Sequence, residues 1–133
     1  MSTVGHPLSD LSNLLSPYTF AIDPPNNALS SRVNEAFLPS ADAPGLPSQA
    51  QCLAWYTELG AWDPTQELAW GNIFAAFRNA VIMQGIAARW AQRQASSQKA
   101  GEIGSLMGSS GDFYWGLLER WRKGRLRAKT ARL

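Results

Sequence analysis

The sequence predicts an all-α protein of three to five helices, with one long buried central helix and one long irregular loop. Apolar residues recur three and four positions apart in several segments, which is the spacing of one helix face. No segment shows the alternation and tight-turn residues of a β-hairpin. Hydrophobic residues make up 45% of the 133 positions, a composition typical of a folded chain.

The first helix is expected over residues 7–16, because Pro7 suits a first helical position and four leucines follow on one face (Leu8, Leu11, Leu14 and Leu15). Pro17 is expected to end this helix. Residues 17–47 are expected to be irregular, apart from a short turn near residues 33–37, since they carry many prolines and paired turn residues. A loop of this length usually has a function, is flexible, or wraps around a partner.

The second helix is expected over residues 48–59, since Ser48 and Gln51 have the spacing of a capping box and Gly60 suits the helix end. The third and longest helix is expected to begin at Thr65 or Gln66 and to end at Gln94. It carries two apolar stripes, and a helix apolar on most sides packs among several neighbours. The rest of the chain offers too little apolar surface to cover it.

A short helix is expected over residues 98–107, followed by a flexible Gly-Ser-Ser-Gly break at residues 108–111. The last helix is expected to start at Asp112 as its N-cap, with apolar residues on one face (Tyr114, Leu117, Leu118 and Trp121).

The net charge of +2 conceals an uneven distribution. The chain up to Glu119 holds five basic and ten acidic residues, a net charge of −5, whereas residues 120–133 hold seven basic residues and no acid. This pattern argues against a basic nucleic-acid-binding domain and leaves residues 120–133 as the only segment expected to contact nucleic acid.

Cysteine and histidine each occur once, at Cys52 and His6, so we expect no internal disulfide and no Cys/His zinc site. The sequence contains no P-loop, GxGxxG, HExxH, GxSxG or CxxC motif. We therefore assign no catalytic, cofactor-binding or metal-binding residue.

The longest apolar stretch, residues 73–90, is interrupted by polar and charged residues, so we expect no transmembrane segment. With no signal peptide expected, the chain is interpreted as soluble, intracellular and cytoplasmic.

Two motifs resemble one known family. Near the start, five residues follow a G-[HD]-P-x-x-D-L pattern: Gly5, His6, Pro7, Asp10 and Leu11. Ten more follow F-x-x-F-[RK]-x-A-x-I-x-Q-G-[IV]-x-A-R: Phe74, Phe77, Arg78, Ala80, Ile82, Gln84, Gly85, Ile86, Ala88 and Arg89. Both patterns resemble the aminoglycoside phosphotransferase-like (choline-kinase-like) family, in the branch related to the kinase-like domain fused to acyl-CoA dehydrogenases. The resemblance covers residues 1–107, and residues 108–133 form a divergent basic amphipathic tail.

The resemblance implies a fragment of the kinase-like C-terminal lobe. Full-length relatives use ATP and Mg²⁺ to phosphorylate a small hydroxyl acceptor, and their catalytic loop, metal-binding Asp and N-lobe lysine lie upstream of the Gly-His-Pro stretch. In this alignment Met1 falls just after the metal-binding triplet. The chain as written is therefore expected to be inactive alone, with no ATP or Mg²⁺ site of its own.

The resemblance also assigns roles to six residues. Asp10 and His6 correspond to positions that brace the catalytic loop; the alternatives are an Asp favoured by the helix dipole and a capping or packing His. Phe74, Phe77, Arg78 and Gln84 are candidates for the wall of the acceptor pocket. Here the alternatives are aromatic residues of the core and polar residues paired inside the complete fold.

A second hypothesis is a non-catalytic helical interaction module. In this interpretation the exposed core surface promotes self-association, and the tail binds a protein, RNA or an acidic membrane surface. A solvated tail without a partner is the simpler alternative.

Overall fold

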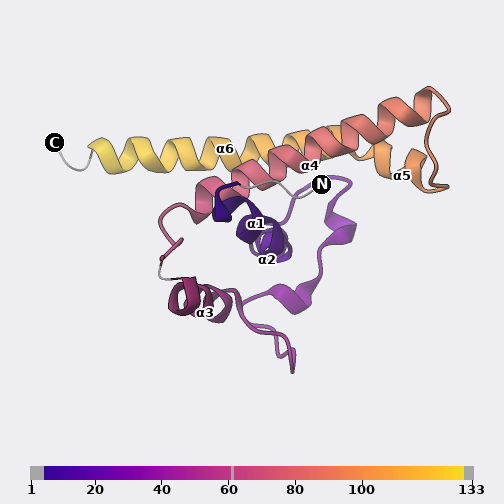
Figure 1. Cartoon of the computed structure of the whole chain (residues 1–133). Helices are drawn as coiled ribbons and strands as arrows, with labels where there is room; N and C mark the ends of the chain where they lie inside the picture. The colour runs from indigo at the N-terminus through magenta and orange to yellow at the C-terminus, as the bar shows by residue number, and fades with distance from the viewer. Residues whose placement is uncertain (1–4, 61, 131–133) are drawn as a thin grey trace. The chain divides into compact units, whose positions relative to one another are not determined.

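The computed structural model describes residues 5–60 and 62–130, and this part of the chain contains helices and no strand (Figure 1). The all-α prediction is therefore confirmed. The helices in chain order are α1 (Pro7–Leu14), α2 (Ser16–Ile22), the 3₁₀ turns η1 (Ser30–Arg32) and η2 (Glu35–Phe37), α3 (Gln49–Gly60), α4 (Leu68–Ala91), α5 (Ala100–Ser105) and α6 (Met107–Thr130). The described residues thus form six α-helices, where we expected three to five.

The chain divides into two compact units, and the boundary lies inside α4. The first unit contains the described residues up to Asn26 together with Ser30–Ala75. The second contains Asn27–Leu29 and the described residues from Ala76 onward. These two units are defined by contacts within the fold. The boundary expected after residue 107 is of another kind, because it marks where the family resemblance ends, and it stays a prediction.

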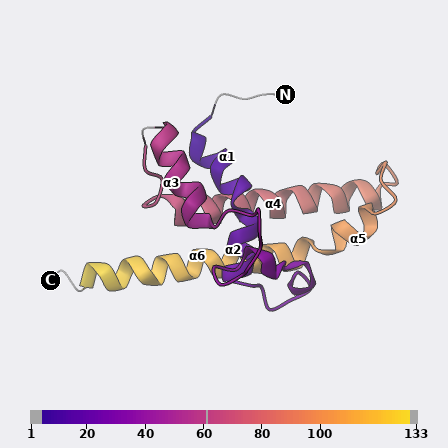
Figure 2. The same cartoon turned by 90° about the horizontal axis from the view of Figure 1, so that it is seen from below.

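The core of the first unit is an apolar cluster contributed by α1, α2 and the start of α4: Leu11, Leu15, Tyr18 and Leu68. Side chains of η2 and α3 pack against this cluster (Phe37, Cys52, Leu53 and Tyr56). Figure 2 shows α1 beside α3 within this unit. The leucine stripe predicted for the first helix therefore forms the core, except for Leu14, which is 71% exposed.

The region after the first helix is more ordered than expected. Pro17 does not begin an irregular segment, because it lies in the first turn of α2, where proline is tolerated since the missing N–H has no helical acceptor. The turn expected near residues 33–37 is η2, and the side chain of Asn34 caps it by accepting a 3.0 Å hydrogen bond from the Ala36 N–H.

The capping box predicted before α3 is confirmed. The Ser48 N–H donates to Oε1 of Gln51 at 2.8 Å, and the Gln51 N–H donates to Oγ of Ser48 at 3.2 Å. Helix α3 then ends at Gly60, as the sequence predicts.

The long helix α4 starts and ends a few residues inside its predicted bounds. Before it, the Asp63 carboxylate accepts hydrogen bonds from the Thr65 N–H (2.9 Å) and hydroxyl (2.5 Å), which lowers the pKa of Asp63 and holds Thr65 in a turn. Burial along α4 is confined to its first part, where Leu68, Ile73, Ala75 and Ala76 are all at most 9% exposed. Six large apolar side chains are 44–51% exposed: Trp70, Phe74, Phe77, Val81, Ile82 and Trp90. The prediction of a buried helix therefore holds only for this first part, because the described chain does not cover the rest.

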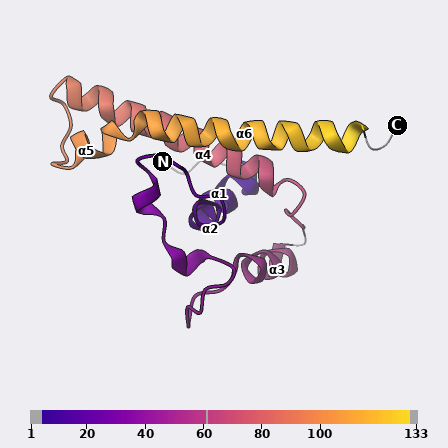
Figure 3. The same ribbon diagram turned by 180° about the vertical axis from the view of Figure 1, so that it is seen from behind.

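In the second unit, α6 runs back along residues 76–91 of α4 after the chain reverses through α5 (Figure 3). The rings of Phe77 and Tyr114 lie 5.3 Å apart between the two long helices. Gly104 lets α5 approach α4 closely, because a Cβ at this position would lie 2.8 Å from Cα of Ala87. Asn27 belongs to this unit and donates from Nδ2 to the Ser109 carbonyl at 2.9 Å.

Two predictions for this region are wrong. Residues 108–111 do not form a flexible break but continue the first turns of α6, and Asp112 lies inside the helix instead of capping it. Each glycine costs a helix about 1 kcal/mol relative to alanine. Burial of Leu106, Ser110 and Phe113, each at most 8% exposed, offsets that cost.

Two glycines of α4 should respond to alanine in opposite directions. A Cβ at Gly71 would collide with Oγ of Ser12 and lie 2.9 Å from Cγ of Leu8, whereas a Cβ at Gly85 meets nothing within 4 Å. We expect Gly71→Ala to lower the free energy of unfolding by about 1–3 kcal/mol through overpacking. Gly85→Ala should raise it by about 0.5–1 kcal/mol through helix propensity. Urea denaturation followed by circular dichroism measures both, and a tolerated Gly71→Ala would contradict the close packing of α1 on α4.

Candidate functional site

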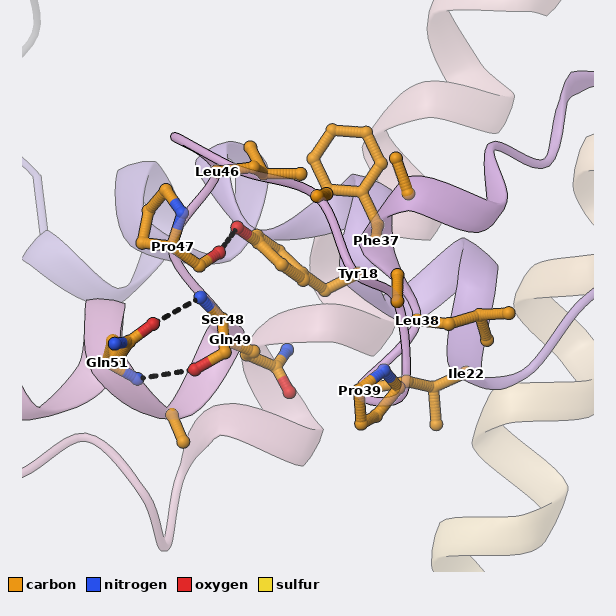
Figure 4. Close-up of a pocket in the computed structure, with 14 residues that line it drawn as sticks. Tyr18, Ile22, Phe37, Leu38, Pro39, Leu46, Pro47, Ser48, Gln49 and Gln51 are labelled. Carbon is orange, nitrogen blue, oxygen red and sulfur yellow. Dashed lines mark hydrogen bonds between the residues drawn. The ribbon is translucent and has the colours of Figure 1, made fainter.

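A cavity of the first unit lies between α2, η2 and the loop that leads into α3 (Figure 4). Its volume is about 410 Å³, within the range of small-molecule sites. The lining residues are Tyr18, Ile22, Ala36, Phe37, Leu38, Pro39, Ala41, Ala43, Leu46, Pro47, Ser48, Gln49, Ala50 and Gln51. Most of them are apolar, so this cavity suits a small molecule with an apolar surface.

Tyr18 is the main polar group of the cavity wall. Its hydroxyl donates a hydrogen bond to the Pro47 carbonyl and lies 4.0 Å from Sγ of Cys52. Its ring meets Phe37 edge to face, with centroids 5.0 Å apart. Burial, helped by the contact with Cys52, raises the pKa of the Tyr18 hydroxyl above its ordinary value. At neutral pH the Tyr18 hydroxyl is therefore protonated, and its hydrogen bond joins the loop at Pro47 to α2.

Two of the polar side chains at the start of α3 are engaged in its N-terminal cap. Ser48 and Gln51 bond reciprocally in the capping box, as the dashed lines of Figure 4 show. None of the fourteen described lining residues is an Asp, Glu, His, Lys or Arg. The wall thus offers shape, apolar surface and a tyrosine hydroxyl.

A second, smaller cavity of about 200 Å³ lies in the second unit where the chain passes from α4 to α5. It is lined by Ile86, Arg89, Gln94, Ala95, Ser96, Ser97, Ala100 and Ile103. The guanidinium of Arg89 bonds within its own helix, because its Nε donates to the Gly85 carbonyl at 3.2 Å. This cavity is a shallow packing gap beside the helix end.

His6 caps α1. Its Nδ1 accepts a 3.2 Å hydrogen bond from the Leu8 N–H, and its ring meets Trp62 edge to face with centroids 5.3 Å apart. The capping and packing alternative named for His6 is therefore the one seen here. Asp10 lies exposed in the first turn of α1, where the helix dipole favours a carboxylate. The bracing role of both residues concerns a catalytic loop from outside this chain and stays a prediction.

The four candidates for the acceptor wall all lie on α4. Phe74 and Phe77 are 44% and 45% exposed, Arg78 is half-buried, and Gln84 is exposed. Phe77 contacts Tyr114 of α6. None of the four lines either cavity described above. Their role in an acceptor pocket stays a prediction that depends on parts outside this chain.

Sequence reasoning missed the cavity around Tyr18. The only signal was the unusual length of the irregular segment 17–47, which suggested a function without naming residues. Tyr18 directly follows Pro17 and falls in the segment expected to be irregular, yet it is 6% exposed and belongs to α2. Its link to Pro47 joins residues 29 positions apart, a distance that no local pattern reveals.

Within residues 5–60 and 62–130, no group of three or more His, Cys, Asp and Glu side chains is placed to hold a metal ion. Over the same residues, no helix has both the length and the apolar character needed to cross a bilayer.

The raised pKa of Tyr18 predicts a loss of stability in alkali. A folded-state pKa above the unfolded value of 10.0 means that this stabilisation is complete below pH 10 and is lost as the pH rises through the folded pKa. Tyr18→Phe should cost about 1 kcal/mol at neutral pH, through the lost hydrogen bond to Pro47, and should flatten the alkaline loss. Chemical denaturation between pH 8 and about pH 11 measures both effects. Tyr56→Phe serves as the matched control and should leave the alkaline loss in place; an unchanged slope in Tyr18→Phe would contradict the assignment.

Comparison with known proteins finds no matching family model, no matching curated protein and no matching solved structure.

Proposed function

We propose that this chain is the non-catalytic, C-terminal-lobe part of an aminoglycoside phosphotransferase-like kinase. The observation that carries the proposal is the pair of motifs that begin at Gly5 and Phe74, which occur in the family's order. In full-length relatives this lobe carries the wall of the pocket for a small hydroxyl acceptor.

The structural setting of the two motifs supports the proposal. The first motif opens α1, with His6 as its N-cap and Pro7 in its first turn. The second motif lies on the single continuous helix α4. Within the first unit the two helices touch, since a Cβ on Gly71 of α4 would meet Ser12 and Leu8 of α1. The helix that the first motif opens, α1, thus packs against the N-terminal part of α4, the helix that carries the second motif.

Under this proposal the chemistry resides outside the chain. Phosphoryl transfer requires carboxylates for Mg²⁺, a group that orients the acceptor hydroxyl, and a cradle for the nucleotide. In this family the residues that supply these groups lie upstream of the Gly-His-Pro stretch. The contribution of this chain is then structural: α1 and α4 form one wall of the lobe.

Calorimetric titration with ATP and MgCl₂ tests the proposal. We expect no saturable heat, with any Kd weaker than about 1 mM, because the nucleotide-binding half is not part of this chain. A nucleotide-binding kinase at the same concentration is the positive control. Saturable binding at micromolar ATP would contradict the claim that this chain lacks the catalytic half.

A second candidate function is a helical interaction module, and the exposed apolar side chains favour it. In the second unit Phe77, Val81, Ile82 and Trp90 of α4 are each 45–51% exposed. Scattered apolar side chains are common on protein surfaces, but several large ones on a single helix mark a contact surface.

This candidate predicts that the chain self-associates. In analytical ultracentrifugation, the mean mass should rise above 14.5 kDa with concentration. Val81→Glu should shift the distribution toward monomer by introducing a charge at the contact, with little effect on stability because Val81 is 48% exposed. Gln92→Glu adds the same charge at an exposed position after α4 and should leave association unchanged. A chain that stays monomeric at all concentrations would contradict the hypothesis that it associates through the exposed side chains of α4.

A further inference from the structure

The part of α6 that follows Glu119 carries a dense positive charge. Residues 120–133 hold seven basic residues and no acid, and five of those basic side chains, Arg120 to Arg127, are exposed on the helix. The last acid before them, Glu119, is paired with Lys123 at 3.3 Å. This segment is therefore a cationic rod at the end of a helix of 24 residues.

Helix α6 also carries two exposed apolar side chains, one before this rod (Trp115) and one within it (Leu126). Phe113 is 6% exposed and packs inward, whereas Trp115 is 53% exposed and Leu126 is 65% exposed. At 3.6 residues per turn, positions 115, 119, 122 and 126 fall on one side of the helix, so Glu119 and Arg122 lie between the two apolar residues. The carboxylate of Glu119 is neutralised by its ion pair with Lys123. Lys123 and Arg125 flank Leu126 on either side of this stripe. We call Trp115, Arg122 and Leu126, with the flanking Lys123, Arg125 and Arg127, the basic face.

We propose that the basic face binds an anionic lipid surface, with α6 lying along the membrane interface. Leu126 and Trp115 enter the boundary between headgroups and acyl chains, where tryptophan is favoured. The long stems of Arg122, Lys123, Arg125 and Arg127 let their charges reach the lipid phosphates. The guanidinium of Arg125 lies 5.1 Å from the centroid of the Trp121 ring. This cation–π contact holds the Arg125 side chain against the helix.

Charge and shape together favour a lipid surface over other polyanions. A nucleic acid would use the cations through its phosphates, but it gives no role to an aliphatic side chain at the centre of the basic face. A groove that accepts a helix would require an uninterrupted apolar stripe, and here Glu119 and Arg122 interrupt it. The inference is independent of the proposed function, because these residues lie in the part of the chain where the family resemblance ends.

Vesicle co-sedimentation of the full chain tests the inference. We expect partitioning onto vesicles of phosphatidylcholine and phosphatidylserine in equal amounts, with weak partitioning onto pure phosphatidylcholine. Arg122→Gln combined with Arg127→Gln should lower the partition coefficient about 25-fold, since each cation near an anionic surface contributes about fivefold. Raising the salt concentration should weaken binding by screening the cations.

A matched pair of substitutions isolates the apolar contribution. Leu126→Ser should lower vesicle binding about tenfold, whereas Ala128→Ser, on the opposite side of the helix, should leave it unchanged. Helix content by circular dichroism confirms that the variants fold. Equal partitioning onto neutral and anionic vesicles would overturn the proposal. So would binding to a single-stranded RNA oligonucleotide that is tighter than to anionic vesicles and equally strong in Leu126→Ser.

Discussion

The constraint on which this structure depends is the apolar character of α4. A helix with large apolar residues on most sides needs neighbours on most sides, because each buried side chain contributes about 1.5–3 kcal/mol that an exposed one forfeits. The described chain buries side chains of α4 only within residues 68–76, and Trp70, Phe77 and Val81 stay about half exposed. This deficit links the two proposed functions: under the first, the rest of a larger lobe would cover α4, and under the second, another molecule would cover it.

Where α4 is covered, small residues make the contact. Gly71 lets α1 approach in the first unit, and Gly104 lets α5 approach in the second. In the first unit, Leu15 and Tyr18 are 1% and 6% exposed and belong to the apolar cluster that joins α1 and α2 to the elements around them. The hydroxyl of Tyr18 donates a hydrogen bond to the Pro47 carbonyl and so joins the long loop to α2. Both residues line the cavity between the loop and α2.

The helices could be predicted from the sequence wherever local signals were strong. The leucine stripe of α1 and the capping box of Ser48 and Gln51 depend on neighbours within one or two turns, and both predictions are confirmed apart from the exposed Leu14. The predictions failed where tertiary packing opposes local preference. Residues 108–111 look like a linker, yet they are helical because Ser110 and Phe113 are buried. Pro17 looks like a helix end but opens α2. The cavity beside Tyr18 could not be predicted, since it depends on a contact across 29 residues.

Hydrogen–deuterium exchange along α4 tests most directly the claim that this helix lacks part of its cover. At a dilution where the chain is monomeric, the account predicts slow exchange at the amides of Ile73 to Ala76, where the helix is buried. Faster exchange is expected over Val81 to Trp90, where large apolar side chains are exposed. Uniformly slow exchange along the whole helix in the monomer would contradict the account, because it would show that α4 is already fully covered within this chain.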